Sequence, residues 1–148
     1  MKISLGCGER KREGVLGLDL VDFGWNKVFD ARKDTIPADD DSVEYIEAEN
    51  FIEHVSREYW PHLFNECWRV LKHNGIIDIT VPDAGKDIRL ALQDPTHLSM
   101  VVAGTFTNYI AGDRPRNSDS GFKKWDIMSI GPDPKDERVL NVKMKPRK

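Results

Sequence analysis

The sequence predicts an α/β fold, a three-layer sandwich built on a mostly parallel sheet with an antiparallel hairpin at its C-terminal end. Three observations support this class. Short apolar runs in the first half repeatedly end on an acidic residue, a segment with helical periodicity stands between two such runs, and two apolar segments near the C-terminus flank a turn rich in proline and aspartate. Strands that alternate with helices are typical of parallel sheets.

Five segments have the apolar composition of strands. They span residues 3–5, 17–20, 27–31, 42–48 and 75–83. The first runs into Gly6-Cys7-Gly8, and a residue without a Cβ permits a positive φ and a close approach of the backbone to a ligand. In an open α/β sheet, the carboxyl end of the first strand borders the usual ligand crevice. The glycine pair alone also fits an ordinary turn, but in this order of strands it predicts a binding site.

The segment 56–72 has the pattern of a helix with one buried stripe. Its apolar side chains recur at intervals of three and four residues, at Trp60, Leu63, Phe64, Cys67, Val70 and Leu71. Ser56 is expected to cap the start of this helix, and Asn74-Gly75 is expected to end it in a left-handed conformation.

The remaining elements are expected in the second half of the chain. Residues 86–93 and 98–110 are further helical candidates, and the polar segment 112–121 is predicted to be a loop over the binding site. Residues 125–130 and 138–144 are predicted to pair as a hairpin on the edge of the sheet.

Few helices are expected in the first half of the chain. Residues 9–14 and 21–26 join the first three strands, and both segments are too short for the helix that usually connects parallel strands. At least one face of the sheet should therefore be thinly covered. An exposed sheet face in turn predicts a homo-oligomer that hides it.

Length and charge limit the possible functions. The chain has 148 residues, which predicts a single domain over 1–148, and its net charge of -3 disfavours a nucleic-acid partner. The sequence shows no signal peptide and no apolar run of transmembrane length, so a cytoplasmic protein without a membrane partner is expected. The two cysteines, Cys7 and Cys67, are not expected to form a disulfide.

The chain resembles the class I methyltransferases that depend on S-adenosylmethionine (SAM). The resemblance covers residues 1–83 well and the remainder loosely. The motifs that carry it, all in the order typical of the family, are Leu5-Gly6-Cys7-Gly8, Asp19, Asp30-Ala31, the segment 36–43, Ile52-Glu53-His54-Val55 and the segment 68–75. It implies a Rossmann-like fold and SAM as the cofactor.

The resemblance also implies which residues bind SAM. The turn at the methionine and ribose parts is formed by Gly6, Cys7 and Gly8. The ribose is contacted by Asp19 and Leu20, and the adenine by Asp30 and Ala31. The methionine end lies near Glu49 and Asn50. A nicotinamide dinucleotide site is disfavoured, because Lys11 stands where its third glycine would be. An acid that many members carry two residues before the first glycine is replaced by Ser4.

Catalytic residues are harder to predict, because the sulfonium is already activated and the protein has mainly to align the acceptor. His97 is the first candidate for a base and Asp83 the second. Glu53-His54 fits an ordinary helix start, or the divalent-cation site of some relatives, which use two glutamates and a following histidine. Some of these relatives add a distant second histidine, for which His97 is the candidate. Asn50 replaces the first of the two glutamates, so Glu53, His54 and His97 remain, and the lost charge lowers the expected affinity for Mg²⁺. No metal ligand is assigned from the sequence.

The predicted function is methyl transfer from SAM to a small-molecule or saccharide-like acceptor, with SAM as the cofactor. The alternative from a different class is a non-catalytic SAM-binding or protein-interaction module with a methyltransferase fold. The reduced helices in the first half of the chain favour this alternative. Turnover of a labelled methyl group distinguishes the two.

Overall fold

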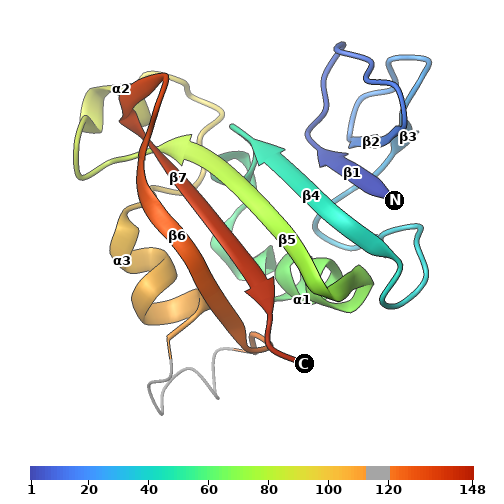
Figure 1. The fold of residues 1–148 in the computed structure, drawn as a ribbon. Helices are drawn as coiled ribbons and strands as arrows, with labels where there is room; N and C mark the ends of the chain where they lie inside the picture. Colours follow the sequence, from blue (N-terminus) through green and yellow to red (C-terminus); the bar gives the residue numbers. More distant parts are fainter. Residues whose placement is uncertain (113–120) are drawn as a thin grey trace.

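A computed structural model describes residues 1–112 and 121–148 of the chain. Its centre is a seven-stranded sheet with the order β3-β2-β1-β4-β5-β7-β6 (Figure 1). The strands are β1 (Lys2–Leu5), β2 (Val15–Asp19), β3 (Lys27–Val28), β4 (Val43–Glu49), β5 (Leu71–Pro82), β6 (Trp125–Asp133) and β7 (Asp136–Pro146). The helical elements are η1 (Ile52–His54), η2 (Arg57–Tyr59), α1 (Trp60–Val70), α2 (Ile88–Leu92), α3 (Ala103–Thr105) and η3 (Phe106–Ile110).

The strand directions confirm the predicted fold class. Strands β1 to β5 pair in parallel, and β7 pairs antiparallel with both β5 and β6. Residues Ile3 of β1 and Ile46 of β4 face each other in register, and both are buried. All the parallel strands therefore end at one edge of the sheet, which is the edge at which a ligand crevice is expected.

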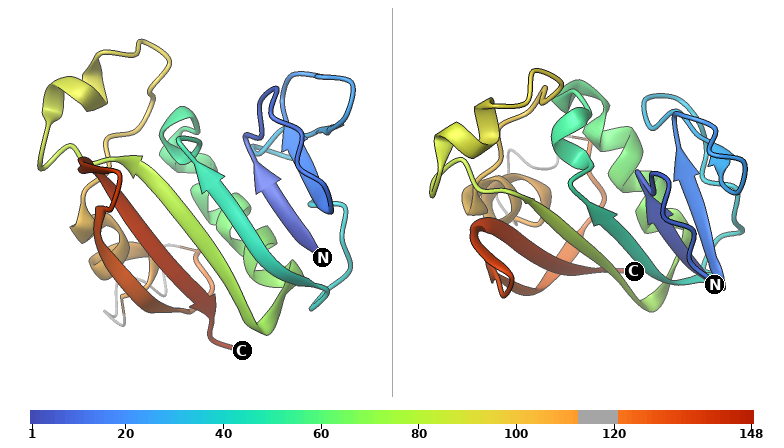
Figure 2. Two further views of the ribbon diagram at one scale, coloured as in Figure 1. Left: turned by 45° about the horizontal axis from the view of Figure 1, so that its top comes forward. Right: turned by 90° about the horizontal axis from the view of Figure 1, so that it is seen from above.

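Helix α1 has the buried stripe that the sequence predicts. Trp60, Leu63, Phe64, Cys67 and Val70 are all buried, and they pack against one face of the sheet. Phe64 makes edge-on ring contacts with Trp60 and Trp125, which joins the helix to the C-terminal hairpin. Figure 2 shows α1 and α3 on the same side of the sheet.

The predicted ends of this helix were wrong. The α-helix begins at Trp60 after the short helix η2, and Ser56 makes no capping hydrogen bond. Its last residue is Val70, and β5 follows immediately at Leu71. Gly75 lies inside β5, where a Cβ would come within 2.9 Å of the carbonyl oxygen of Val43. This glycine thus permits close contact between two strands, and it does not end a helix.

Other expected elements differ in length. β3 is limited to Lys27–Val28. The Phe29 amide still donates to the carbonyl oxygen of Asp19 at 2.8 Å, and a turn begins at Ala31. The hairpin strands are longer than predicted, so only Pro134 and Lys135 lie between them. The predicted loop 112–121 lies for the most part outside the described residues.

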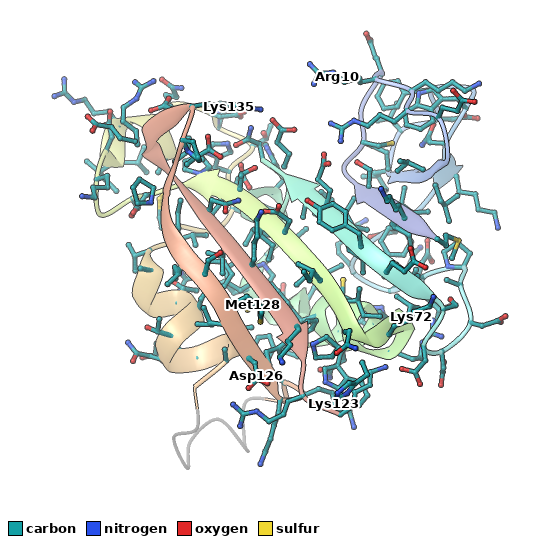
Figure 3. All side chains as sticks on the ribbon, in the orientation of Figure 1. Arg10, Lys72, Lys123, Asp126, Met128 and Lys135 are labelled. Atoms are coloured by element: carbon teal, nitrogen blue, oxygen red, sulfur yellow. The ribbon has the colours of Figure 1, made fainter. Side chains whose placement is uncertain are left out.

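The sheet face opposite α1 carries no helix among the described residues (Figure 2), and a group of polar side chains lies at its centre. Tyr45 Oη donates to Asp78 Oδ2 at 2.7 Å, and Asn141 Nδ2 donates to Asp78 Oδ1 at 2.7 Å. Lys143 Nζ lies 3.3 Å from the same carboxylate. The thin cover is as expected. This face, which is toward the viewer in Figure 3, carries the hydrogen bonds of Asp78 and also the exposed side chain of Met128.

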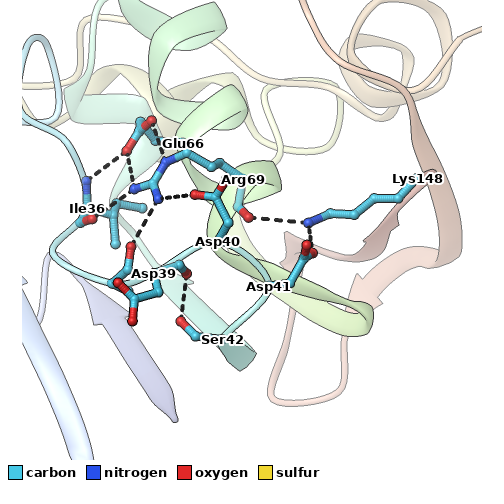
Figure 4. A network of polar contacts seen from close by, with 9 residues as sticks. Ile36, Asp39, Asp40, Asp41, Ser42, Glu66, Arg69 and Lys148 are labelled. Carbon is cyan, nitrogen blue, oxygen red and sulfur yellow. Dashed lines mark hydrogen bonds and ion pairs between the residues drawn. The ribbon is translucent and has the colours of Figure 1, made fainter.

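A polar network fixes the connection between β3 and β4 (Figure 4). Arg69, on the last turn of α1, donates to the carbonyl oxygens of Ile36 and Ala38 at 3.0 Å. It also binds both carboxylate oxygens of Glu66, at 3.0 and 2.9 Å. Burial pushes the pKa of Glu66 upward, but hydrogen bonds from Arg69 and the Ile36 amide outweigh it and leave the pKa below its ordinary value.

Two further expectations concern the whole chain. Cys7 and Cys67 are both free cysteines, as the sequence predicts. Within the described ranges, no helix is long and apolar enough to span a bilayer.

Candidate functional site: a cleft at the carboxyl ends of the parallel strands

A cleft of about 380 Å³ lies where β1, β2 and β4 end. Asp19 ends β2 and Leu20 follows it, residues 29–32 follow β3, and residues 50–56 follow β4, so the ends of three strands supply most of its wall. The lining residues are Gly6, Asp19, Leu20, Phe29, Asp30, Ala31, Arg32, Asn50, Phe51, His54, Val55, Ser56, Tyr59 and Leu98.

The bend after β1 needs glycine. Gly6 has a φ of +61°, and a Cβ at this position would lie 2.5 Å from Cδ2 of Phe51. Gly8 has a φ of +58°, and a Cβ there would meet no atom within 4 Å, so the space beside it is open. The chain therefore turns tightly against Phe51 and presents bare backbone toward the cleft.

Asp19 is directed to this bend. Its Oδ2 accepts a hydrogen bond from the Gly8 amide at 3.0 Å, and its Oδ1 accepts one from the Val21 amide at 3.0 Å. Each carboxylate oxygen can accept a further hydrogen bond, so the group can still bind a ligand hydroxyl. The side chain thus joins the ends of β1 and β2 on the wall of the cleft.

Asp30 also lines the cleft, and it forms an ion pair there. Arg32 Nε donates to Oδ1 and Arg32 Nη2 donates to Oδ2, both at 2.7 Å. The hydrogen bonds from Arg32 lower the pKa of Asp30 to about 2. Asp30 is therefore anionic, but it shares its hydrogen-bonding capacity with Arg32, a residue that the sequence analysis did not single out.

The opposite wall comes from the segments after β4 and α2. His54, Ser56 and Tyr59 supply polar groups, and Leu98 supplies an apolar one. Leu98 is 64% exposed and Leu20 is 60% exposed, so two large apolar side chains face solvent in the same cleft. Tyr59 and Leu98 were missed altogether in the sequence analysis, because a single tyrosine or leucine outside a motif gives no signal before the fold brings it to the site. His54 and Ser56 were considered only in other roles.

Cys7 and Glu49 lie on a second cavity of about 560 Å³ on the other side of the glycine bend, which Gly6 also lines. Arg10 and Arg12 line this cavity too, and Arg12 pairs with Glu47. Figure 3 shows Arg10 at the tip of the loop after β1. Burial is the main cause of the raised pKa of the Cys7 thiol, and the charge of Asp19 is the second cause.

The structure brings six of the nine predicted cofactor residues to the main cleft. Gly8 is joined to the cleft through its hydrogen bond to Asp19.

The two predicted bases do not line the cleft. His97 Nδ1 lies 2.7 Å from the carbonyl oxygen of Ala91, and its Nε2 lies 4.0 Å from Oε1 of Glu53. Asp83 is buried, and its Oδ1 accepts from the Gly85 amide at 2.9 Å. The structure places both residues in the segments that support the cleft wall.

Glu53 is the most unusual acid of this region. It is 2% exposed, and neither carboxylate oxygen has a hydrogen-bond partner among the described residues. Burial raises the pKa of Glu53 to about 7. His54 and His97 lie beside it, and one ligand atom from each of the three residues lies within 4.8 Å of the others.

The comparisons with known proteins agree with this geometry. The model of the methyltransferase domain family matches residues 6–79, half of the chain, and this match includes the glycine bend, Asp19, Asp30 and Asn50. The chain belongs to this family. It is a SAM-dependent methyltransferase of class I. No curated protein matches the sequence significantly.

Solved structures share the fold at low sequence identity. A SAM-dependent methyltransferase from Archaeoglobus fulgidus has a TM-score of 0.69 at 18% identity, over 97% of this chain and 85% of that one. One from Clostridium acetobutylicum has a TM-score of 0.69 at 9% identity, over 98% and 83%. Phosphoethanolamine N-methyltransferase 1 of Haemonchus contortus, bound to phosphoethanolamine and S-adenosylhomocysteine, has a TM-score of 0.67 at 14% identity, over 97% and 38%.

The cleft residues fit SAM, the cofactor of the family. The backbone bend leaves open space beside Gly8, which a side chain would fill, and Asp19 offers carboxylate oxygens next to it. Exposed apolar side chains such as Leu20 suit the flat face of an adenine. When bound, SAM supplies an activated methyl group on a sulfonium.

Proposed function

We propose that this methyltransferase transfers the methyl group of SAM to a small-molecule or saccharide-like acceptor. The observation that carries the proposal is the outer wall of the cleft, where Ser56, His54 and Tyr59 stand beside exposed Leu98. Polar groups next to apolar surface are typical of small-molecule sites. The net charge of -3 gives no basic field for a nucleic acid.

The proposal assigns the cofactor as the sequence analysis does. Gly6, Cys7 and Gly8 hold the methionine and ribose parts, and Asp19 with Leu20 holds the ribose. Asp30 and Ala31 meet the adenine, and Glu49 with Asn50 lies at the methionine end. In support, Asp19 contacts the glycine bend, and most of the set lines one cleft. Because Asp30 is paired with Arg32, its carboxylate oxygens have to accept hydrogen bonds from both the guanidinium and the adenine.

The chemistry asks little of individual side chains. Methyl transfer is an in-line displacement, so the cleft has to hold the acceptor nucleophile opposite the sulfonium and keep water out. The role of His97 or Asp83 as a base stays a prediction. Neither side chain lines the cleft, so a direct proton transfer to either would need a movement of the cleft wall. The proposal includes a cytoplasmic protein with the single domain 1–148.

The expected homo-oligomer also stays a prediction. Its basis, a sheet face without helices among the described residues, is present, but that face carries a set of hydrogen bonds centred on Asp78. Light scattering on the purified chain measures the mass. A monomer at every concentration would remove the prediction.

The test of the function is transfer of a labelled methyl group from SAM to panels of small molecules and saccharides. We expect turnover with a member of these panels, and loss of most of it in Asp19→Ala. Transfer only to RNA or protein would contradict the proposed acceptor class. SAM binding without turnover on any acceptor would favour the alternative, a non-catalytic SAM-binding or interaction module.

A further inference from the structure

We propose that Glu53, His54 and His97 bind a divalent transition-metal ion beside the cleft. The three residues come from η1 and from the segment after α2, and one ligand atom of each lies within 4.8 Å of the other two. Ligand atoms of a tetrahedral ion are about 3.4 Å apart, because each bond is about 2.1 Å long. Side-chain movements of about 1 to 1.5 Å would therefore bring all three ligand atoms to one ion.

The buried carboxylate points most directly to a missing partner. Glu53 is 2% exposed, and both of its oxygens lack a hydrogen bond within the described part of the chain. A carboxylate removed from water without a partner is strongly destabilising, and native proteins pair such groups with a cation or with donors. The neighbouring His97 Nε2 is 4.0 Å from Oε1, which is too far for a hydrogen bond but suits two ligands of one ion.

Both histidines are oriented as metal ligands usually are. A carbonyl oxygen only accepts, so His97 Nδ1, at 2.7 Å from Ala91 O, carries the proton and leaves Nε2 free. His54 Nδ1 lies 3.2 Å from the carbonyl oxygen of Thr96, which leaves its Nε2 free in the same way. Metal-binding histidines almost always donate their other ring N–H to a carbonyl or carboxylate, which fixes the ring.

The backbone holds the two halves of the site together without the ion. The amides of Leu98 and Ser99 donate to the carbonyl oxygen of Glu53 at 2.7 and 3.0 Å. Ser99 Oγ donates to the carbonyl oxygen of Val55 at 2.9 Å. The segment that carries His97 is thereby attached to the segment that carries Glu53 and His54, so the ligands are arranged in advance.

The donor set selects the class of ion. Two imidazole nitrogens and one carboxylate suit Zn²⁺, Co²⁺, Ni²⁺ or Fe²⁺, whereas Mg²⁺ prefers oxygen ligands throughout. A second carboxylate, Asp94, places its Oδ2 at 3.8 Å from His97 Nε2 and adds negative charge next to the ion. This arrangement differs from the two-glutamate pattern considered from the sequence, because the second acid comes from position 94 and Asn50 faces the cleft.

A bound ion would hold one side chain of the cleft wall in place. His54 lines the cleft and is also a proposed ligand, so an ion would fix the ring on which the acceptor wall depends. The inference does not rest on the acceptor class proposed above, because binding of the ion can be measured without an acceptor or SAM.

The experiment titrates the full chain, stripped of metal with a chelator, with Co²⁺ and follows visible absorption. One equivalent is expected to bind with the bands of a nitrogen- and oxygen-ligated Co²⁺. Glu53→Gln and His97→Gln should each weaken binding by at least about tenfold. Glu53→Gln keeps the side-chain volume and removes a buried charge, so it should fold, as circular dichroism can verify. His73→Gln, at an exposed position on β5, is the matched control and should bind like the wild type.

A second measurement does not depend on spectroscopy. Zn²⁺ should raise the melting temperature of the wild type and of His73→Gln, but not that of Glu53→Gln, because an ion that binds only the folded state stabilises it. Absence of saturable Co²⁺ binding by the wild type would overturn the inference. Binding that survives both Glu53→Gln and His97→Gln would also overturn it, because the ion would then lie elsewhere.

Discussion

Asp19 joins the two strand ends that form the cleft, and its carboxylate is the residue-scale feature on which SAM binding most depends. It accepts hydrogen bonds from the amides of Gly8 and Val21 and has capacity left for two ribose hydroxyls. The resemblance to the SAM-dependent methyltransferases made this residue predictable, because it places an acid at the end of the second strand. Arg32, which pairs with Asp30, gave no comparable signal because its role depends on the short turn after β3.

Replacement of Asp19 by Ala should weaken SAM binding about 10- to 100-fold. The change removes two acceptors of ribose hydrogen bonds, each of which contributes about 1 kcal/mol. Isothermal titration calorimetry measures the affinity. Asp22→Ala is the control, because Asp22 is exposed and accepts from the Gly24 amide two residues along the chain. Equal affinity of wild type and Asp19→Ala would show that Asp19 has no ribose role.

The two glycines of the bend should respond differently to alanine. Both have a positive φ, which costs about 1 kcal/mol or more with a side chain. Gly6→Ala also places a Cβ 2.5 Å from Phe51, whereas Gly8→Ala meets open space. Urea unfolding should therefore show a clearly larger loss of stability for Gly6→Ala. If the two variants lost equal stability, the packing of the bend against Phe51 would be refuted.

At the scale of elements, α1 and the connection before β4 depend on each other through Arg69. The carbonyl oxygens of Ile36 and Ala38 have no strand partner, and Arg69 satisfies both while it binds Glu66 (Figure 4). The sequence predicted the buried stripe of α1, because its period follows from packing against a sheet. It did not predict the end of the helix, because Gly75 is needed for the approach of β5 to β4 and resembles a helix stop.

Arg69→Met should lower the free energy of unfolding by about 2 kcal/mol at neutral pH, because Glu66 loses its cationic partner and the Ala38 carbonyl oxygen loses the hydrogen bond from Arg69. Lys72→Met, which breaks an exposed pair with Glu44, should change the free energy of unfolding little.

The pair of Arg69 and Glu66 also predicts a pH dependence. The pKa of Glu66 is lowered in the folded state, so the stability that Glu66 contributes is complete above its unfolded pKa and is lost as the pH falls through the folded pKa. Arg69→Met should therefore show a smaller loss of stability under acid than wild type, and an equal loss would refute the coupling.

For the whole molecule, the class and the parallel sheet followed from elementary patterns. Apolar runs that end on acids indicated a parallel sheet, and the short connections indicated a thin first half; both features are present. The cleft was predictable where its wall is built from the local turns after β1, β2 and β3 and from Asn50 after β4. The other wall combines η1 with Leu98 and neighbours about forty residues away, and such pairings arise only from tertiary packing.

The central claim is that the cleft at the ends of β1, β2 and β4 binds the adenosine part of the cofactor. A crystal structure of the chain with S-adenosylhomocysteine tests this claim most directly. We expect the ribose hydroxyls within hydrogen-bond distance of Asp19 and the adenine between Leu20 and Ala31. A nucleoside in the cavity beside Arg10 and Arg12, with Asp19 bonded only to the backbone, would contradict the account.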